Sequence, residues 1–302
     1  MKESINISER SFEISDSIVI CSEPRGGSTW LMSIVYCLTQ SIINWEPLHP
    51  GSGVVPISFL WGDRPDIPEK NNNPEYLQVM SKILTLKVGT PWTLQFASAK
   101  DLAICSHVLT KFVRANLLLP WMTRNFQFRH KPILIVRHPI PTALSQIQAF
   151  DNNSPFANRF NIPKCVNNQR LIKHEPYLTS LRSKLERHVA LWLINNLPTL
   201  THSRQKYSWR IIYYENLIVD PVGEITKLFS DLHLPLNMKV LSHIPFRNPS
   251  FTSFKRSFNP DPVKQLNKWM SRLSADDLKK IQDIFIYFNF NLYSVSSAFP
   301  NI

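Results

Sequence analysis

A turn rich in hydrogen-bond donors occupies residues 24–30, where the sequence runs Pro-Arg-Gly-Gly-Ser-Thr-Trp between a short apolar run and a helix-like stretch. A helix that starts directly after a strand presents unpaired N–H groups and the positive end of its dipole. Adjacent glycines allow the backbone to approach a ligand closely. The donors are supplied by Arg25, Gly26, Gly27, Ser28 and Thr29. The turn therefore predicts a site for a phosphate-like or sulfate-like group.

Two other interpretations of this turn remain open. An ordinary strand-to-helix turn uses glycines for packing, but Arg25 inside the turn and hydroxyls at the helix start favour a ligand. A nucleoside-triphosphate site has the pattern G-x-x-x-x-G-K-[ST], with a lysine that reaches the phosphates. Here the glycines are adjacent and no lysine follows them, so triphosphate chemistry is the weaker interpretation.

A second candidate anion site follows the apolar segment 131–136. Arg137 stands where this predicted strand ends, and Ser145 follows eight residues later, beyond two prolines. Ligands of doubly wound sheets bind outside the carboxyl ends of the strands, which places Arg137 on the same edge as the glycine turn. The alternative is a surface arginine paired with a nearby acid.

Together, the glycine turn and the Arg137…Ser145 pair resemble the two signature sites of sulfotransferases that use 3′-phosphoadenosine 5′-phosphosulfate (PAPS). The segment 213–217 with Asp220-Pro221 is similar to the Y-E-[DN]-L…D-P segment of that family, and the resemblance covers residues 16–290. It implies a P-loop-like fold that binds PAPS and releases the bisphosphate PAP. The implied donor-binding residues are Arg25, Gly26, Gly27, Ser28, Thr29, Trp30, Arg137, Ser145, Tyr214, Lys255 and Arg256.

Sulfonyl transfer to a hydroxyl needs a base for the acceptor proton and positive groups at the leaving phosphate. Arg25 fits the second role, and the candidates for the base are Glu46, His49, His107 and Lys111. The K-T-H pattern of small-molecule sulfotransferases is not reproduced at 105–112. Glu46-Pro47 resembles the E-P segment of carbohydrate-type sulfotransferases, so Glu46 is the favoured base and His49 the second choice.

The elements that position these residues alternate between apolar runs and helical patterns, which is typical of a mostly parallel sheet covered by helices. We expect an α/β, P-loop-like, three-layer fold in one domain, 1–302, with a core at about 16–290. The expected strands are 17–21, 103–110, 133–137 and 210–214. The expected helices are 29–38, 75–84, 141–149, 178–197, 221–232 and 275–288.

Composition limits the class of protein. With 302 residues, 43% of them hydrophobic, the chain has enough apolar side chains for a buried core, and its net charge of +12 suits an anionic ligand. The four cysteines show no metal-binding spacing, and neither a leader nor a membrane-spanning run is evident. We expect a cytoplasmic enzyme that needs no metal and binds no nucleic acid.

The sequence therefore predicts sulfonyl transfer from PAPS to a hydroxyl of a carbohydrate or glycoconjugate, by in-line displacement. Four aromatic residues could stack on sugar faces, although core packing is an equally good explanation for them: Trp45, Phe59, Trp61 and Trp92. The alternatives are sulfation of a small-molecule hydroxyl, a nucleotide-dependent kinase, and a binding protein without catalytic activity.

Overall fold

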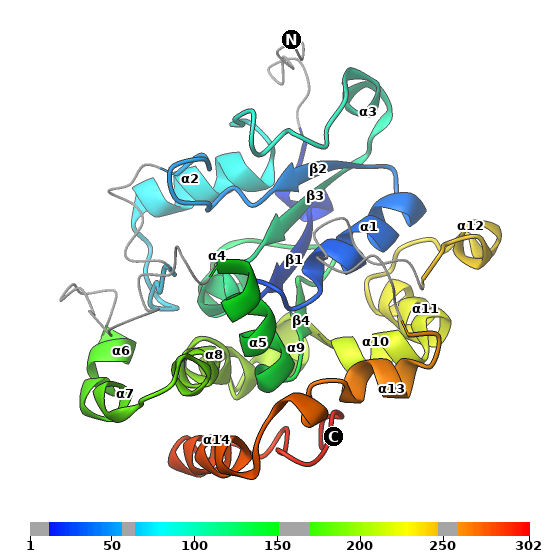
Figure 1. The fold of residues 1–302 in the computed structure, drawn as a ribbon. Coiled ribbons are helices and arrows are strands. Elements are labelled where there is room, and N and C mark those ends of the chain that lie inside the picture. Colours follow the sequence, from blue (N-terminus) through cyan, green and yellow to red (C-terminus); the bar gives the residue numbers. More distant parts are fainter. Residues whose placement is uncertain (1–11, 56–63, 151–168, 247–258) are drawn as a thin grey trace.

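A parallel sheet of five strands forms the centre of the protein, and a computed structural model describes residues 12–55, 64–150, 169–246 and 259–302 (Figure 1). The strands are β1 (Ile18–Ser22), β2 (Ser41–Trp45), β3 (His107–Phe112), β4 (Ile133–Val136) and β5 (Arg210–Tyr213). They lie in the order β2-β3-β1-β4-β5, and every neighbouring pair is parallel. All carboxyl ends therefore lie at one edge, and the predicted α/β, P-loop-like, three-layer fold is confirmed.

Helices cover both faces of the sheet (Figure 1). They are α1 (Ser28–Leu38), α2 (Pro74–Leu84), α3 (Ala99–Ile104), α4 (Leu119–Asn125), α5 (Pro139–Phe150), α6 (Gln169–Ile172), α7 (Glu175–Ser180), α8 (Lys184–Leu200), α9 (Gln205–Ser208), α10 (Tyr214–Val219), α11 (Pro221–Asp231), α12 (Met238–Ser242), α13 (Pro262–Asn267) and α14 (Ala275–Tyr287). In the described part of the chain, no helix is long and apolar enough to cross a membrane.

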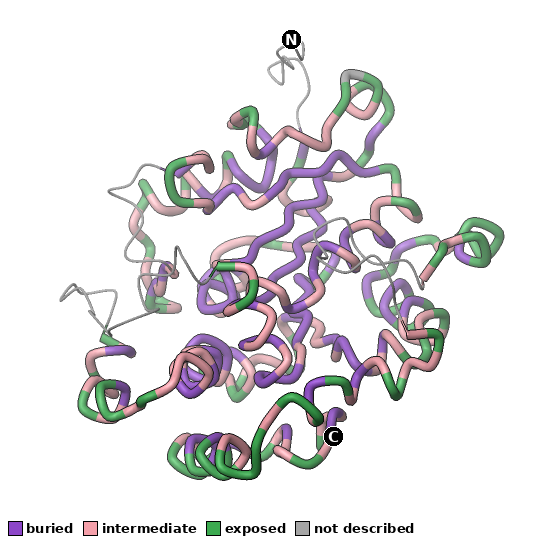
Figure 2. The backbone as a smooth tube through the Cα atoms, viewed as in Figure 1, coloured by how far each residue is buried: buried purple, intermediate pink, exposed green. Residues whose placement is uncertain are grey.

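Side chains of the inner strands alternate between two apolar cores, as the period of a strand requires. In β1, Ile18 and Ile20 pack with α1, α10 and α11, whereas Val19 and Cys21 pack with α2, α4, α5, α8 and α14. These residues are almost fully buried, and Figure 2 shows the strands as the buried centre of the protein. Each such side chain stabilises the fold by roughly 1.5–3 kcal/mol through burial.

The edge strand β2 was not among the expected strands. Its sequence contains Ser41 and Asn44, and these polar residues interrupt the apolar run that would mark a buried strand. Both are buried in the fold, and Asn44 Nδ2 donates a hydrogen bond of 2.9 Å to the carbonyl oxygen of Ile83. The local pattern therefore concealed a strand whose buried Asn44 amide nitrogen is satisfied by a tertiary contact.

Two expected elements have wrong boundaries, and a serine cap explains each case. The strand expected at 103–110 begins at His107, because a capping box between Ser98 and Asp101 starts helix α3 across the preceding residues. The helix expected at 178–197 is divided into α7 and α8, because a capping box between Ser183 and Glu186 starts a new helix. Reciprocal side-chain bonds of this kind fix a helix start more firmly than apolar spacing does.

Candidate functional site

Each of the five strands brings one part of the candidate site to the carboxyl edge of the sheet. The glycine turn follows β1, Glu46 follows β2, and Lys111 lies near the end of β3. Arg137 follows β4 and Tyr214 follows β5. Because the strands are parallel and in register, residues that are distant in the sequence converge here.

The glycine turn leaves no room for side chains at its two glycines. Gly27 has φ of +100°, and a Cβ atom placed there would lie 2.5 Å from Cδ2 of Tyr214. A Cβ atom at Gly26 would lie 2.3 Å from Oγ of Ser22 and 2.9 Å from the carbonyl oxygen of Glu23. Sequence and geometry agree that these positions require glycine.

The start of helix α1 keeps free donors at the turn. Trp30 and Leu31 donate their backbone N–H groups to the carbonyl oxygen of Gly27, each over 3.1 Å. Within the described ranges, no hydrogen bond uses the N–H groups of Gly27, Ser28 or Thr29. The side chains of Ser28 and Thr29 are buried in the first turn of the helix. This arrangement is that of a helix N-terminus which can bind an anion.

Direct hydrogen bonds join the two expected anion sites. Arg25 donates from Nε to Oγ of Ser145 over 3.0 Å, and Arg137 donates from Nη1 to the carbonyl oxygen of Arg25 over 3.0 Å. The turn after β1 and the turn after β4 thus form one continuous donor surface. The structure therefore brings together the three charged or hydroxyl residues that the sequence placed in two separate signatures.

Arg137 lies over the ring of Tyr214, with its guanidinium carbon 4.7 Å from the ring centre. The register of β4 and β5 produces this contact, because the preceding residues Val136 and Tyr213 are paired. The Nε atom of Arg137 is buried and has no hydrogen-bond partner, and no carboxylate of the described residues forms an ion pair with this side chain. A half-buried guanidinium with an unsatisfied N–H group can bind an anion.

The electrostatics of Arg25 point in the same direction. Burial lowers the pKa of its guanidinium, and the positive charge of Arg137 lowers that pKa further, whereas Tyr214 opposes the shift. Two positive groups that interact in this way repel each other, and an anion bound between them would relieve this repulsion. Trp30 is half-buried, and its ring meets that of Tyr214 edge-on, with centroids 6.0 Å apart.

A buried ion pair lies at the end of β2 and β3. Nζ of Lys111 lies 2.5 Å from Oε1 of Glu46 and 3.7 Å from the ring centre of Trp45. The Lys111 side chain is 2% exposed, so burial lowers its pKa, although the charge of Glu46 acts against this shift. Glu46 has φ of +42°, and its carbonyl oxygen accepts the N–H of His49 over 2.9 Å. The imidazole of His49 packs on Trp92.

Several side chains that the sequence suggested lie elsewhere. His107 begins β3 and therefore lies at the amino edge of the sheet, where its Nδ1 is 3.0 Å from the carbonyl oxygen of Asp16. Trp45 is buried beneath Lys111 and against Phe96, so it cannot stack on a sugar. The remaining suggested residues Phe59, Trp61, Lys255 and Arg256 lie outside the residues that the structure describes.

A network beneath the glycine turn was not anticipated. Glu23 directly follows β1, is 3% exposed, and forms an ion pair of 2.8 Å with Arg64. Gln146 donates from Nε2 to the carbonyl oxygen of Pro24 over 2.9 Å, which ties α5 to the turn. The position of Glu23 between the strand and the glycines was the available signal, but no local pattern identified its partners.

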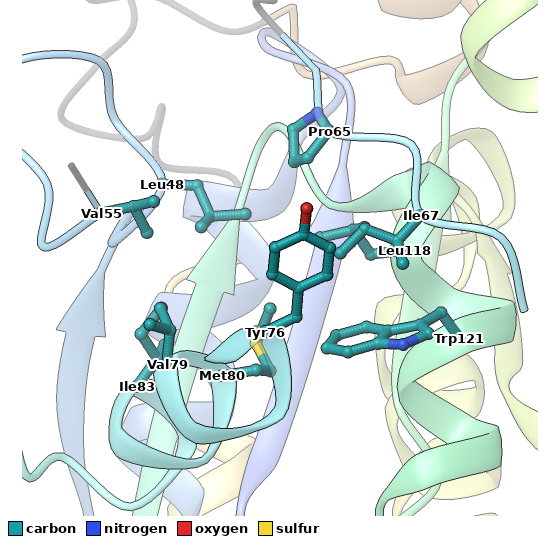
Figure 3. A pocket seen from close by; sticks show the side chains of 10 residues that line it. All are labelled: Leu48, Val55, Pro65, Ile67, Tyr76, Val79, Met80, Ile83, Leu118 and Trp121. Atoms are coloured by element: carbon teal, nitrogen blue, oxygen red, sulfur yellow. The ribbon is translucent and has the colours of Figure 1, made fainter. Parts of the chain in front are cut away.

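An apolar pocket lies next to the end of β2 (Figure 3). Tyr76 contributes a hydroxyl group, which Figure 3 shows directed toward Pro65. The lining residues are Leu48, Val55, Pro65, Ile67, Tyr76, Val79, Met80, Ile83, Leu118 and Trp121. Leu48 connects this pocket to the Glu46–Lys111 pair, because it follows Glu46 by two residues in the same turn.

Fold and site together define an α/β protein of P-loop-like architecture with a candidate anion site at the carboxyl edge. No protein-family model matches the sequence, and no curated protein matches it. Mouse sulfotransferase SULT7A1 complexed with PAP is a similar solved structure, at 13% identity and a TM-score of 0.46, over 92% of this chain and 85% of that chain.

Two further solved structures give comparable similarities. The sulfotransferase domain of the Synechococcus PCC 7002 olefin synthase has 20% identity and a TM-score of 0.42, over 96% of this chain and 100% of that chain. The sulfotransferase domain from the curacin biosynthetic pathway has 16% identity and a TM-score of 0.46, over 93% of this chain and 100% of that chain. The function is therefore inferred from the site itself.

Proposed function

We propose that this chain is a PAPS-dependent sulfotransferase that transfers the sulfonyl group to a hydroxyl by in-line displacement. The observation that carries the proposal is the joined donor surface, where Arg25 and Arg137 lie beside the glycine turn and no carboxylate of the described residues pairs with Arg137. PAPS carries two anionic groups, at its 5′ and 3′ ends, and the two connected turns offer a donor set for each.

In this proposal the donor binds along the carboxyl edge. The N–H groups of Gly27, Ser28 and Thr29 hold the 5′-phosphosulfate, and Arg25 stabilises the charge that develops on the leaving phosphate. Arg137 and Ser145 hold the 3′-phosphate. The remaining nucleotide contacts are assigned to Gly26, Trp30, Tyr214, Lys255 and Arg256.

The same proposal assigns Glu46 as the base, with His49 as the second candidate. As the acceptor oxygen bonds to sulfur, the bond between sulfur and the phosphate oxygen breaks, and the hydroxyl proton passes to the carboxylate of Glu46. PAP leaves with the electron pair of the broken bond. Lys111 holds Oε1 of Glu46 and thereby fixes the carboxylate at the edge of the sheet.

The acceptor class divides into two candidates. The E-P segment at Glu46 favours a saccharide, whereas the apolar lining beside Leu48 favours the hydroxyl of an apolar alcohol or phenol. Tyr76 provides the hydroxyl in that lining, which gives a polyhydroxylated sugar few partners. Transfer of radiolabelled sulfonyl from PAPS to a panel of phenols, fatty alcohols and oligosaccharides decides between these classes.

Calorimetric titration with PAP and AMP tests the donor assignment, because the two ligands differ at the 3′-phosphate. A charge-assisted hydrogen bond is worth about 1.5–3 kcal/mol, so wild type should bind PAP at least tenfold more tightly than AMP. Arg137→Ala should lose most of this preference and retain its AMP affinity. Arg129→Ala, which removes an exposed arginine paired with Asp16, is the control.

The outcome of this titration also separates the enzyme classes. Equal affinity of wild type for PAP and AMP, or tighter binding of ATP with Mg²⁺ than of PAP, would exclude the sulfotransferase and favour a kinase. Binding of PAP without transfer to any acceptor would favour the non-catalytic alternative.

A further inference from the structure

Behind the proposed 3′-phosphate site, three segments meet in a buried polar cluster, formed by His138, Glu215, Tyr293 and Ser294. Oε1 of Glu215 accepts the backbone N–H of His138 over 2.9 Å, and Oε2 accepts the hydroxyl of Tyr293 over 2.8 Å. His138 Nδ1 accepts the N–H of Ile140, which leaves Nε2–H to donate to the carbonyl oxygen of Ser294 over 3.0 Å. Glu215 and Tyr293 are both about 1% exposed.

This polar cluster is adjacent in sequence to two donor-site residues. His138 follows Arg137, and Glu215 follows Tyr214, so the hydrogen bond between His138 and Glu215 holds the arginine over the tyrosine ring. Tyr293 completes the arrangement from the segment after α14, which lies far from both residues in the sequence.

The cluster also controls the charge near the anion site. Glu215 is close enough to interact electrostatically with Arg137, yet the two side chains form no ion pair. Both carboxylate oxygens are instead occupied by neutral donors, the N–H of His138 and the hydroxyl of Tyr293. The guanidinium of Arg137 thus keeps its capacity to bind an external anion.

We propose that Tyr293 is a positioning residue for the nucleotide donor, whose hydroxyl keeps the Glu215 carboxylate from neutralising Arg137. This inference rests on the proposed function, because the anion that Arg137 binds is the 3′-phosphate. Tyr293 does not touch the donor. It acts through Glu215, and its effect is selective for ligands that carry the 3′-phosphate.

Tyr293→Phe should weaken PAP binding about tenfold and leave AMP binding unchanged, because the freed Oε2 of Glu215 turns toward Arg137. Glu215→Gln should bind PAP as wild type does, since the tyrosine hydroxyl can accept from the new amide. The double variant, Tyr293→Phe with Glu215→Gln, should recover the PAP affinity lost in Tyr293→Phe, because no carboxylate remains to compete with the 3′-phosphate for Arg137. A merely structural role of Tyr293 predicts instead that the double variant binds PAP as weakly as Tyr293→Phe.

The control is Tyr287→Phe, which removes the hydroxyl that contacts Nδ1 of His174 in the same region of the chain and should leave PAP binding unchanged. Calorimetry follows PAP and AMP, and circular dichroism verifies the fold. Unchanged PAP affinity in Tyr293→Phe, or a double variant as weak as Tyr293→Phe, would overturn the inference.

Two further comparisons keep the test decisive. If Tyr293→Phe does not fold, the double variant is compared with Glu215→Gln, and a weaker PAP affinity in the double variant would overturn the inference. Failure of the proposed function is distinguished by wild type itself, which would then show no preference for PAP over AMP.

Discussion

At the scale of single residues, Gly27 combines two separate constraints. Its φ of +100° is accessible to glycine, and the ring of Tyr214 occupies the space of a side chain. Conformational strain and steric contact both oppose any other residue there. The position therefore connects the backbone of the turn to the aromatic ring that also supports Arg137.

Gly27→Ala should lose PAP binding and reduce the free energy of unfolding by about 1–3 kcal/mol, because the new methyl group displaces the Tyr214 ring. Gly51→Ala is the matched control, since Gly51 also has positive φ, +75°, but has no atom within 4 Å of the added Cβ. That variant should be destabilised by strain alone and bind PAP normally. Denaturant unfolding and calorimetry measure both effects, and normal PAP binding by Gly27→Ala would contradict the assigned role of the turn.

Much of the donor surface could be predicted from single residues, because glycines, a serine, a threonine and two arginines occur at short, characteristic spacings. The partners of Glu23 and Glu215 could not be predicted in this way. Arg64 and Tyr293 reach these carboxylates from 41 and 78 residues away. No local pattern encodes such contacts, since they depend on how whole elements pack.

At the scale of elements, the ends of β2 and β3 present Glu46 and Lys111 as a pair. Neighbouring positions Trp45 and Lys111 are in register, so the carboxylate that follows β2 reaches the ammonium group of β3. This pair could be predicted only together with the edge strand β2, which the sequence pattern does not indicate, because Ser41 and Asn44 disrupt its apolar run. Capping boxes similarly moved the starts of β3 and α8 away from their expected positions.

Glu46→Gln should reduce sulfonyl transfer by about 10²–10⁴-fold while PAP binding is retained, as expected for loss of a general base. Because this change also leaves the Lys111 ammonium buried without its carboxylate, the double variant Glu46→Gln with Lys111→Met shows whether the fold or the chemistry was affected. Glu75→Gln, at an exposed carboxylate of α2, should be fully active. Radiolabelled transfer assays measure the rates, and activity close to wild type in Glu46→Gln would direct attention to His49.

At the scale of the whole molecule, stability in acid depends on a histidine held neutral by the fold. Burial, together with a smaller effect of the Arg137 charge, lowers the pKa of His138 from 6.5 to about 4, although the hydrogen bond to Ser294 acts in the opposite direction. Between these two pKa values the unfolded chain binds a proton that the folded chain does not. The stabilising contribution is therefore present above pH 6.5 and is lost as the pH falls toward 4.

Wild type should lose about 2–3 kcal/mol of unfolding free energy through His138 between pH 7 and pH 4.5. His138→Gln has an amide that can still donate to Ser294. Its loss of unfolding free energy over the same pH interval should be smaller than that of wild type by this amount. Burial raises the pKa of Glu215 and so opposes the acid effect, but this contribution is common to both proteins and cancels in the difference. Denaturant titrations at the two pH values provide the comparison, and parallel losses in the two proteins would contradict it.

The contact between Tyr293 and Glu215 also determines when the protein acquires its site. Ribosomes deliver the glycine turn first, then Glu215, and Tyr293 only 78 residues after Glu215, while domains of this size fold through intermediates as the chain emerges. A nascent chain can therefore form the sheet before Glu215 has its tyrosine partner. Under the proposed role of Tyr293, that carboxylate is until then free to neutralise Arg137, so a nascent chain that ends before Tyr293 should not bind the proposed nucleotide.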